Sequence, residues 1–350
     1  MNAVSRLVIA IIVVIIIIAA TIAVYVTFYL YKPAPATVSV ILDSNAEYYA
    51  PFFLALDKGY FSSQGLNVIY NIGSGSANTI SQLAAGVAPM AFTDAMTGIL
   101  AIGKNNASIV AVASILPLIG LAIIFLTKSG ITKPKDLEGK KVGMAPGSAS
   151  YQLFPLYCKL AGINYSRVKI VTMSLNALPT ALISGQVDAV SLVIGGIGSA
   201  AIASARQAGL NASYFLYSDV GITAPGYVLW VRSDFLNAHK DIVAKFVTAL
   251  LMGIRDTLIN PNDAAVAYAR HIAGVDLNIV KAAVNDYVNL VKNALIKAPI
   301  QNKLLGYIVP DYWMNAWSYV VNYLGGKYVS NINAYYTNDF VTAANIVLPS

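Results

Sequence analysis

Segments with strand character alternate with segments of helical character over most of the chain. Apolar runs bounded by turn residues predict strands, and apolar positions three to four residues apart predict helices. We expect strands at 38–42, 66–71, 90–92, 108–114, 141–145, 168–173, 187–194 and 227–232, and helices between them at 49–58, 77–85, 151–161 and 177–184. Such alternation predicts an α/β fold with mainly parallel sheets covered by helices.

The alternation falls into two similar units. The composition becomes polar and rich in lysine after Lys128, and a second strand–helix series begins there. After the last strand, helical patterns at 242–259, 264–273 and 279–295 must pack back on the earlier units. We therefore expect two lobes with a cleft between them.

An uncharged apolar run precedes these units. It extends over residues 7–31 between Arg6 and Lys32, and aromatic side chains gather at its far end. A hydrocarbon core about 30 Å thick needs roughly 20 apolar residues, and signal-peptide cores are shorter than this run. The run predicts one N-terminal transmembrane helix, an uncleaved anchor that leaves the rest of the chain outside the cell.

Composition limits the remaining classes. The net charge is +7, and because the basic residues are scattered, no basic stripe for nucleic acid is expected. A single cysteine, Cys158, excludes a disulfide framework, and with only His239 and His271 we expect neither a metal site nor a cofactor. Sequons at Asn106, Asn164 and Asn211 are compatible with an extracytoplasmic, glycosylated location.

Two loops rich in glycine and serine occupy equivalent places in the two units. They are Gly73-Ser74-Gly75-Ser76 and Pro146-Gly147-Ser148-Ala149-Ser150, and each precedes a helix. Ligands of open α/β sheets bind beyond the strand ends, where helices offer unpaired N–H groups. Glycine allows close approach to a ligand and serine can donate hydrogen bonds, although the same serines could be only helix caps.

Seven stretches of the chain resemble the substrate-binding proteins of ABC importers for nitrate, sulfonates, taurine and thiamine pyrimidine precursors. The first stretch is 50–61 together with 64–68, the next three are 73–76, 136–143 and 184–190, and the last three are 260–261, 306–307 and 336–340. The last three are similar to the thiamine-precursor branch. That branch has an aromatic residue and a histidine where this chain reads Leu42-Asp43-Ser44-Asn45-Ala46-Glu47-Tyr48-Tyr49, so the chain departs from it there.

The resemblance implies a periplasmic-binding-protein fold of the second type. We expect residues 1–36 to form the anchor and linker, 37–127 and 222–350 to form the first lobe, and 128–221 to form the second. The resemblance further implies that the chain captures a small solute and passes it to an ABC permease with its ATPase subunit. No enzyme activity is expected, and the ectodomain should be a monomer. A heteroaromatic, pyrimidine-like solute is favoured over an anion such as nitrate or a sulfonate.

The expected solute contacts come from the loops that follow the strands. They are Asp43, Asn45, Tyr48, Ser74, Gly75, Ser76, Asp94, Ala95, Ser114, Gly147, Ser148, Ala149, Ser150, Asn176 and Gly195. Asp43 and Asp94 bear on solute class, because carboxylates repel an oxyanion and accept from an amino group.

Three enzyme interpretations and a scaffold remain as alternatives. Residues 196–201 imitate a dinucleotide-binding loop, and Ser74 or Ser148 could be a nucleophile, but the two histidines lie in late helices. Related fungal pyrimidine synthases place a lysine and a histidine in the segment that reads Phe92-Thr93-Asp94-Ala95-Met96-Thr97-Gly98 here, which has neither. A surface scaffold predicts no bound solute.

Overall fold

The protein divides into two compact units, residues 1–36 and 37–350. A computed structural model describes residues 3–25, 34–298, 300 and 303–347. The two units are described separately below.

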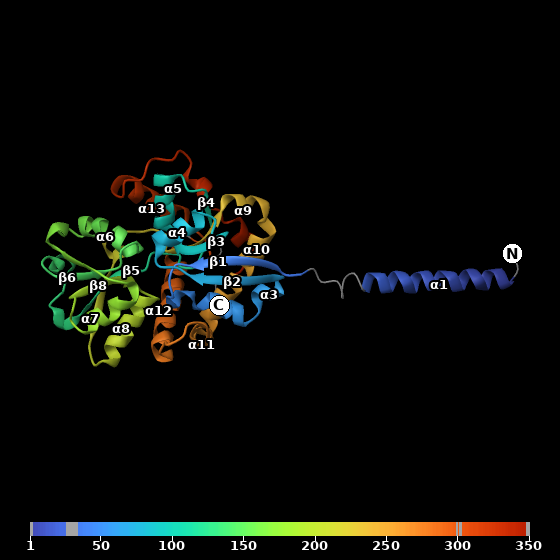
Figure 1. Ribbon diagram of the computed structural model, residues 1–350, viewed down its shortest axis with the longest axis horizontal. Coiled ribbons are helices and arrows are strands. Elements are labelled where there is room, and N and C mark those ends of the chain that lie inside the picture. Colours follow the sequence, from blue (N-terminus) through green and yellow to red (C-terminus); the bar gives the residue numbers. More distant parts are fainter. Residues whose placement is uncertain (1–2, 26–33, 299, 301–302, 348–350) are drawn as a thin grey trace. The chain divides into compact units, whose positions relative to one another are not determined.

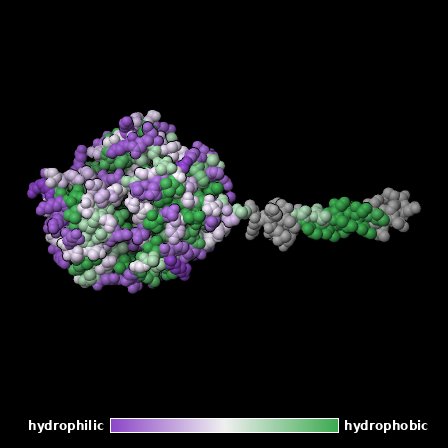
Figure 2. Space-filling model, viewed as in Figure 1, coloured by the Kyte–Doolittle hydropathy of each residue, from purple (hydrophilic) through white to green (hydrophobic). Residues whose placement is uncertain are grey.

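The N-terminal unit contains helix α1, Ala3–Tyr25. Its described side chains are apolar and exposed, as the green surface of this helix in Figure 2 shows. Within the described residues, none of the helices has the combination of length and apolar character that a bilayer crossing requires. The expected transmembrane helix and single-pass anchor over 7–31 are therefore not supported. The described helix ends at Tyr25, and the expected aromatic end at Phe28, Tyr29 and Tyr31 lies outside the described residues.

The second unit is built on two five-stranded sheets (Figure 1). The first sheet has the order β2-β1-β3-β10-β4, formed by Leu66–Ile72, Ala36–Leu42, Met90–Asp94, Tyr227–Arg232 and Ile109–Ser114. The second has the order β7-β6-β8-β5-β9, formed by Lys169–Thr172, Lys141–Met144, Ala189–Val193, Leu121–Leu126 and Ala212–Leu216. Every residue of β3, β5 and β8 is buried, as expected for strands covered on both faces.

Both sheets are mixed rather than mainly parallel. β1 pairs with β3 in parallel, and β6 pairs in parallel with both β7 and β8. β10, however, is antiparallel to β3 and β4, and β5 is antiparallel to β8 and β9. The two antiparallel strands are those that the chain enters directly after crossing from the other sheet. The expectation of mainly parallel sheets is wrong at these two strands.

The crossings define the two lobes. The chain passes from the first sheet to the second over 115–120, and returns over 217–226. β5 thus lies in the second sheet, whereas the sequence placed all of 37–127 in the first lobe. The crossing segments run side by side, since Gly226 N donates to Leu116 O at 3.0 Å and Ile119 N donates to Ala224 O at 2.9 Å.

Helices cover both sheets. On the first lobe they are α2 Ala50–Asp57, α3 Tyr60–Ser63, α4 Ser76–Ala84, α5 Ala95–Asn105, α9 Ser233–Ala238, α10 Lys240–Ile259, α11 Pro261–His271, α13 Pro310–Tyr323 and α14 Asp339–Ala344. On the second lobe they are α6 Ala149–Leu160, α7 Leu178–Ile183 and α8 Ile197–Gln207. α12, Leu277–Lys297, packs against α8 and α11, and its Tyr287 hydroxyl donates to Ile115 O in the first crossing at 3.0 Å.

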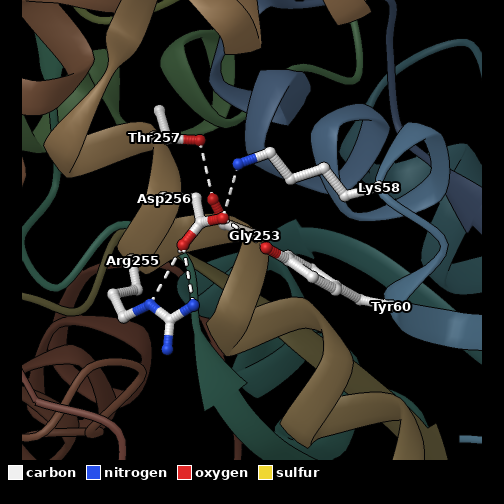
Figure 3. Close-up of polar contacts among 6 residues, drawn as sticks. All are labelled: Lys58, Tyr60, Gly253, Arg255, Asp256 and Thr257. Atoms are coloured by element: carbon white, nitrogen blue, oxygen red, sulfur yellow. Dashed lines mark hydrogen bonds and ion pairs between the residues drawn. The ribbon is translucent and has the colours of Figure 1, made fainter. Parts of the chain in front are cut away.

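The base of the first lobe contains a cluster of charged and polar side chains around Asp256 of α10 (Figure 3). Lys58 Nζ lies 2.6 Å from Asp256 Oδ2, and Arg255 Nη2 lies 2.8 Å from Oδ1. The Tyr60 hydroxyl also donates to Oδ2. Burial raises the pKa of the Asp256 carboxyl, but the hydrogen bonds from Lys58, Tyr60 and Arg255 outweigh it and hold the pKa below its ordinary value. The cluster therefore fastens the α2–α3 turn to α10 through an ionised carboxylate.

We expect Asp256→Asn to lower the free energy of unfolding by about 1–3 kcal/mol, because the donors lose a charged acceptor. Asp241→Asn on the same helix is the matched control, since Asp241 is exposed and forms only a surface pair with Lys245. The contribution of Asp256 to the free energy of unfolding should be fully present above about pH 4, the pKa of an aspartate in the unfolded chain. It should be lost as the pH falls through the lowered pKa of Asp256 in the folded protein. Urea unfolding at pH 7 and pH 3 measures both effects; equal stability of the two variants at pH 7 would contradict the role assigned to the cluster.

Candidate functional site

A cavity lies between the lobes at the ends of the strands. Its volume is about 30 Å³, and residues of both lobes line it. From the first lobe come the segment after β1, with Asp43, Ser44 and Tyr48, and the start of α4, with Gly75 and Ser76. The second lobe contributes Ser148, Ala149 and Ser150 at the start of α6. The two glycine- and serine-rich loops thus meet across one cavity.

A wider opening of about 660 Å³ adjoins this cavity and shares Ser44 and Leu175 with it. It is lined by the expected residues Asn45, Ser74 and Asn176, together with Pro146 and His271. Ser74 and Asn176 are exposed, so these two side chains lie at the entrance rather than in the enclosed space.

Direct contacts hold the lobes together around the cavity. Ala77 N of α4 donates to Gly147 O at 3.1 Å, and Gln152 Nε2 of α6 donates to Thr97 Oγ1 of α5 at 3.1 Å. The Tyr48 ring packs on Gly196, where an added Cβ would lie 2.4 Å from Tyr48 Cδ1. This arrangement is a closed one, in which the lobes enclose the cavity.

Asp43 is the hydrogen-bonding centre of the first-lobe side. It is 2% exposed, and hydroxyl groups from η2 (Glu47–Tyr49), α4 and β3 surround its carboxylate. The pKa of Asp43 is raised to about 6, because burial, with a smaller effect of the nearby Asp94, outweighs the hydroxyl hydrogen bonds that lower it. A carboxylate held in this way orders the segment after β1.

Asp94 plays a different part. Its Oδ1 accepts from Thr97 N at 2.8 Å and so caps α5, while its buried Oδ2 has no hydrogen-bond partner among the described residues. Burial raises the pKa of Asp94, and the hydrogen bond from Thr97 opposes the rise. Asp94 lines neither the cavity nor the wider opening.

Three further expected residues also lie away from both spaces. Ala95 N donates to Gly226 O at 2.8 Å, and Ser114 Oγ donates to Tyr227 O at 3.3 Å, so both serve the backbone near the crossings. Gly195 faces α12, since an added Cβ would lie 3.0 Å from Tyr287 Cα. Gly147 is at the rim, where its carbonyl accepts from Ala77.

The apolar part of the lining was not foreseen. It consists of Leu121, Leu175, Leu192, Val193, Ile197 and the ring of Tyr227. The Tyr227 ring centroid lies 4.4 Å from that of Tyr48, so two aromatic rings form one wall. Tyr227 directly follows Pro225-Gly226 at the start of a strand. This position was the one sequence feature that could have indicated Tyr227 as a lining residue.

Other features of this part of the molecule are structural. Cys158 is fully buried, and burial raises the pKa of its thiol to about 12. His271 Nε2 lies 2.8 Å from Asp57 Oδ1, and its ring stacks on Phe53. Among the described residues no group of three or more side chains is arranged to hold a metal ion.

Two α/β lobes joined by two crossing segments and closed over a polar cavity define the class of two-lobed substrate-binding proteins. Solved structures agree with this fold: the periplasmic aliphatic sulphonate-binding protein SsuA of Escherichia coli superposes with a TM-score of 0.62 at 15% identity, over 84% of this chain and 89% of that one. The expected two-lobed fold is confirmed.

The NMT1/THI5-like family model matches residues 46–264, more than half of the chain, and the chain belongs to this family. The formylaminopyrimidine-binding protein of Halalkalibacterium halodurans is 27% identical over 232 residues, which are 65% of this chain and 68% of the relative. The 4-amino-5-hydroxymethyl-2-methylpyrimidine phosphate synthase of Aspergillus parasiticus is 27% identical over 247 residues, 66% of this chain and 70% of that one. The expected kinship with solute-binding proteins is confirmed, and the relatives include proteins named as enzymes.

Proposed function

We propose that this protein is the extracytoplasmic solute-binding component of an ABC importer. It captures a small solute between its lobes and delivers it to a permease driven by a separate ATPase subunit. The observation that carries the proposal is the enclosed cavity to which both serine-rich loops contribute. Together with the adjoining opening of about 660 Å³, it provides a space of the size found at small-ligand sites.

A small heteroaromatic solute is favoured. The rings of Tyr48 and Tyr227, tilted by 37° to each other, form an aromatic wall, and leucine, valine and isoleucine side chains complete an apolar lining that suits the faces and edges of an aromatic ring. Asp43 places a carboxyl group at the cavity, and its described lining residues include no Lys or Arg. The relative named for formylaminopyrimidine binding supports the same class.

Binding without chemistry is the second part of the proposal. The residues around the cavity offer Asp43, serines and tyrosines, and its described lining contains no histidine, lysine or cysteine that would act as a base or covalent catalyst. The nearest histidine, His271, lies at the wider opening and is paired with Asp57.

We expect the full-length chain, purified without denaturation, to carry or to bind one small solute per monomer. Native mass spectrometry should detect a co-purified solute, and calorimetry should measure binding of an aminopyrimidine, nitrate or a small sulfonate with a 1:1 stoichiometry. Incubation should return the solute unchanged. If no solute co-purifies and none of the panel binds, the scaffold alternative takes precedence; if the solute is converted, the protein is an enzyme.

A further inference from the structure

The Asp43 carboxylate uses its acceptor capacity within the protein. Hydroxyl oxygens lie at hydrogen-bonding distance from both carboxylate oxygens: 2.8 Å for Tyr49, 2.9 Å for Ser76, 3.1 Å for Thr93, 3.1 Å for Ser44 and 3.3 Å for Tyr48. A carboxylate has about four lone-pair sites, so these five hydroxyl groups saturate it. A solute therefore finds no free acceptor on Asp43 itself.

The same bonds fix where the hydroxyl protons point. Each hydroxyl has one proton, and those of Ser76, Thr93 and Tyr49 go to Asp43. Ser44 and Tyr48 also lie 3.2 Å from each other, and whichever donates, both protons remain within the cluster. The cavity-lining oxygens of Ser44, Tyr48 and Ser76 are left with lone pairs for an incoming group.

The serines of the second lobe are arranged in the same way. Ser148 Oγ donates to Ala145 O at 2.8 Å, and Ser150 Oγ lies 3.1 Å from Ser191 O and 2.9 Å from Ser148 Oγ. Both protons again stay within the protein. The expectation that these serines donate hydrogen bonds to the solute is thus at odds with their hydrogen bonds, which leave them oxygen acceptors.

We propose that the cavity selects a solute that brings its own N–H or O–H donors, and that Asp43 is a positioning residue that turns the hydroxyl lone pairs toward it. This inference rests on the proposed function and names its solute class. Nitrate or a sulfonate has no proton to donate and would meet hydroxyl lone pairs from both lobes. Donors for an acceptor atom of the solute remain in the N–H groups of Ala149 and Ser150 at the start of α6, which have no partner within the helix. The N–H of Tyr151 already donates to Ser148 Oγ at 3.2 Å.

Asp43→Asn tests this assignment with almost no change of shape. The new NH₂ group must donate to hydroxyl oxygens that now donate to Asp43, so some hydroxyl protons turn toward the cavity. We expect the Kd for an aminopyrimidine to rise about tenfold or more. The affinity for nitrate or a small sulfonate should stay the same or increase.

Two further variants separate hydroxyl orientation from charge and folding. Ser76→Ala removes one acceptor oxygen and leaves Asp43 its other donors, so a smaller loss of aminopyrimidine affinity, about three- to tenfold, is expected. Asp136→Asn removes a half-buried carboxylate in the turn before β6, away from the cavity, and should leave every Kd unchanged. Thermal melting by circular dichroism establishes that each variant is folded. Should Asp43→Asn fail to fold, Ser76→Ala, compared with Asp136→Asn, carries the test.

The pH profile provides an independent readout. The titratable groups that face the Asp43 carboxyl are Tyr48, Tyr49, Tyr227 and Asp94. Burial raises the pKa of Asp43 to about 6. Below that pH the protonated carboxyl becomes a donor, as the asparagine is, so the ratio of variant to wild-type Kd should be constant above about pH 7 and fall toward one at pH 5. Using the ratio cancels any titration of the solute.

The outcomes distinguish this inference from the function on which it rests. If the wild type binds nitrate or the sulfonate more tightly than the aminopyrimidine, or if folded Asp43→Asn binds the aminopyrimidine unchanged, the inference is wrong and the solute-binding function stands. Absence of any bound or co-purified solute removes the proposed function itself.

Discussion

Gly196→Ala is expected to weaken solute binding about tenfold or more while leaving each lobe folded. The added Cβ would lie 2.4 Å from Cδ1 and 2.8 Å from Cε1 of Tyr48, on the opposite lobe. Tyr48 is buried and its ring packs on those of Tyr49 and Tyr227, so it has no free direction in which to move. The closed arrangement is therefore disfavoured, and a ligand that binds the closed state loses the corresponding free energy.

Calorimetry with the preferred solute measures the loss, and small-angle scattering with and without solute measures closure. The wild type should become more compact when solute is added, and Gly196→Ala should not. Gly103→Ala is the matched control, because an added Cβ in α5 finds its nearest neighbours at 3.4 Å and lies away from the cavity. Wild-type affinity and compaction in Gly196→Ala would mean that this contact does not limit closure.

Gly253→Ala should lower the free energy of unfolding by about 1–3 kcal/mol or more. Gly253 lies inside α10, where an added Cβ would be 2.3 Å from Pro51 O and 2.8 Å from Ala55 Cβ of α2. A backbone oxygen in a helix cannot rotate away, so α10 and α2 must separate. Loss of that contact spreads through the first lobe because α10 packs against α2 along much of its length.

Gly103→Ala again provides the comparison, since the same chemical change occurs inside a helix and the nearest backbone atoms lie at 3.4 Å, an ordinary van der Waals distance. There alanine's better helix propensity should leave stability equal to wild type or higher by up to about 1 kcal/mol. Urea unfolding followed by circular dichroism measures both variants under one condition. Equal stability of the two would show that the α10–α2 contact is not tight.

Local pattern was sufficient for most strands and helices of the two lobes. The expected strand at 227–232 coincides with β10, and the helices expected at 242–259 and 279–295 lie within α10 and α12. β5 was missed because Leu121–Leu126 is wholly buried, and a short apolar run without alternation has no distinctive period. The positions of β5 and β10 in their sheets depend on pairing with strands far away in the sequence. The hydrophobic periodicity of a segment carries no information about such pairing.

The site was predictable at the loops and less so elsewhere. Both serine-rich loops line one cavity because each follows a strand end and opens a helix, a local signal that the sequence carries. Asp94 and Ser114 also follow strands, yet they cap a helix and bind backbone. The local sequence does not indicate whether a serine hydroxyl can donate to a solute or, like that of Ser148, already donates to a backbone carbonyl such as Ala145 O. That difference depends on the folded structure.

The strand order dictates when each lobe can be completed as the chain emerges from the ribosome. All strands of the second sheet lie in one continuous stretch, 121–216, so this sheet can form as soon as that stretch is available. In the first sheet the strand next to β4 is β10, which also pairs with β3, and Ala111 of β4 is bridged on its other side only by the late residue Tyr336 among the described residues. β3 and β4 therefore keep open edges until residue 232 has been synthesised, and the nascent first half is a species that can pair with another chain. The sheet of the second lobe, which starts later in the sequence, can therefore be completed first. The sheet of the first lobe is completed only when β10 returns to it.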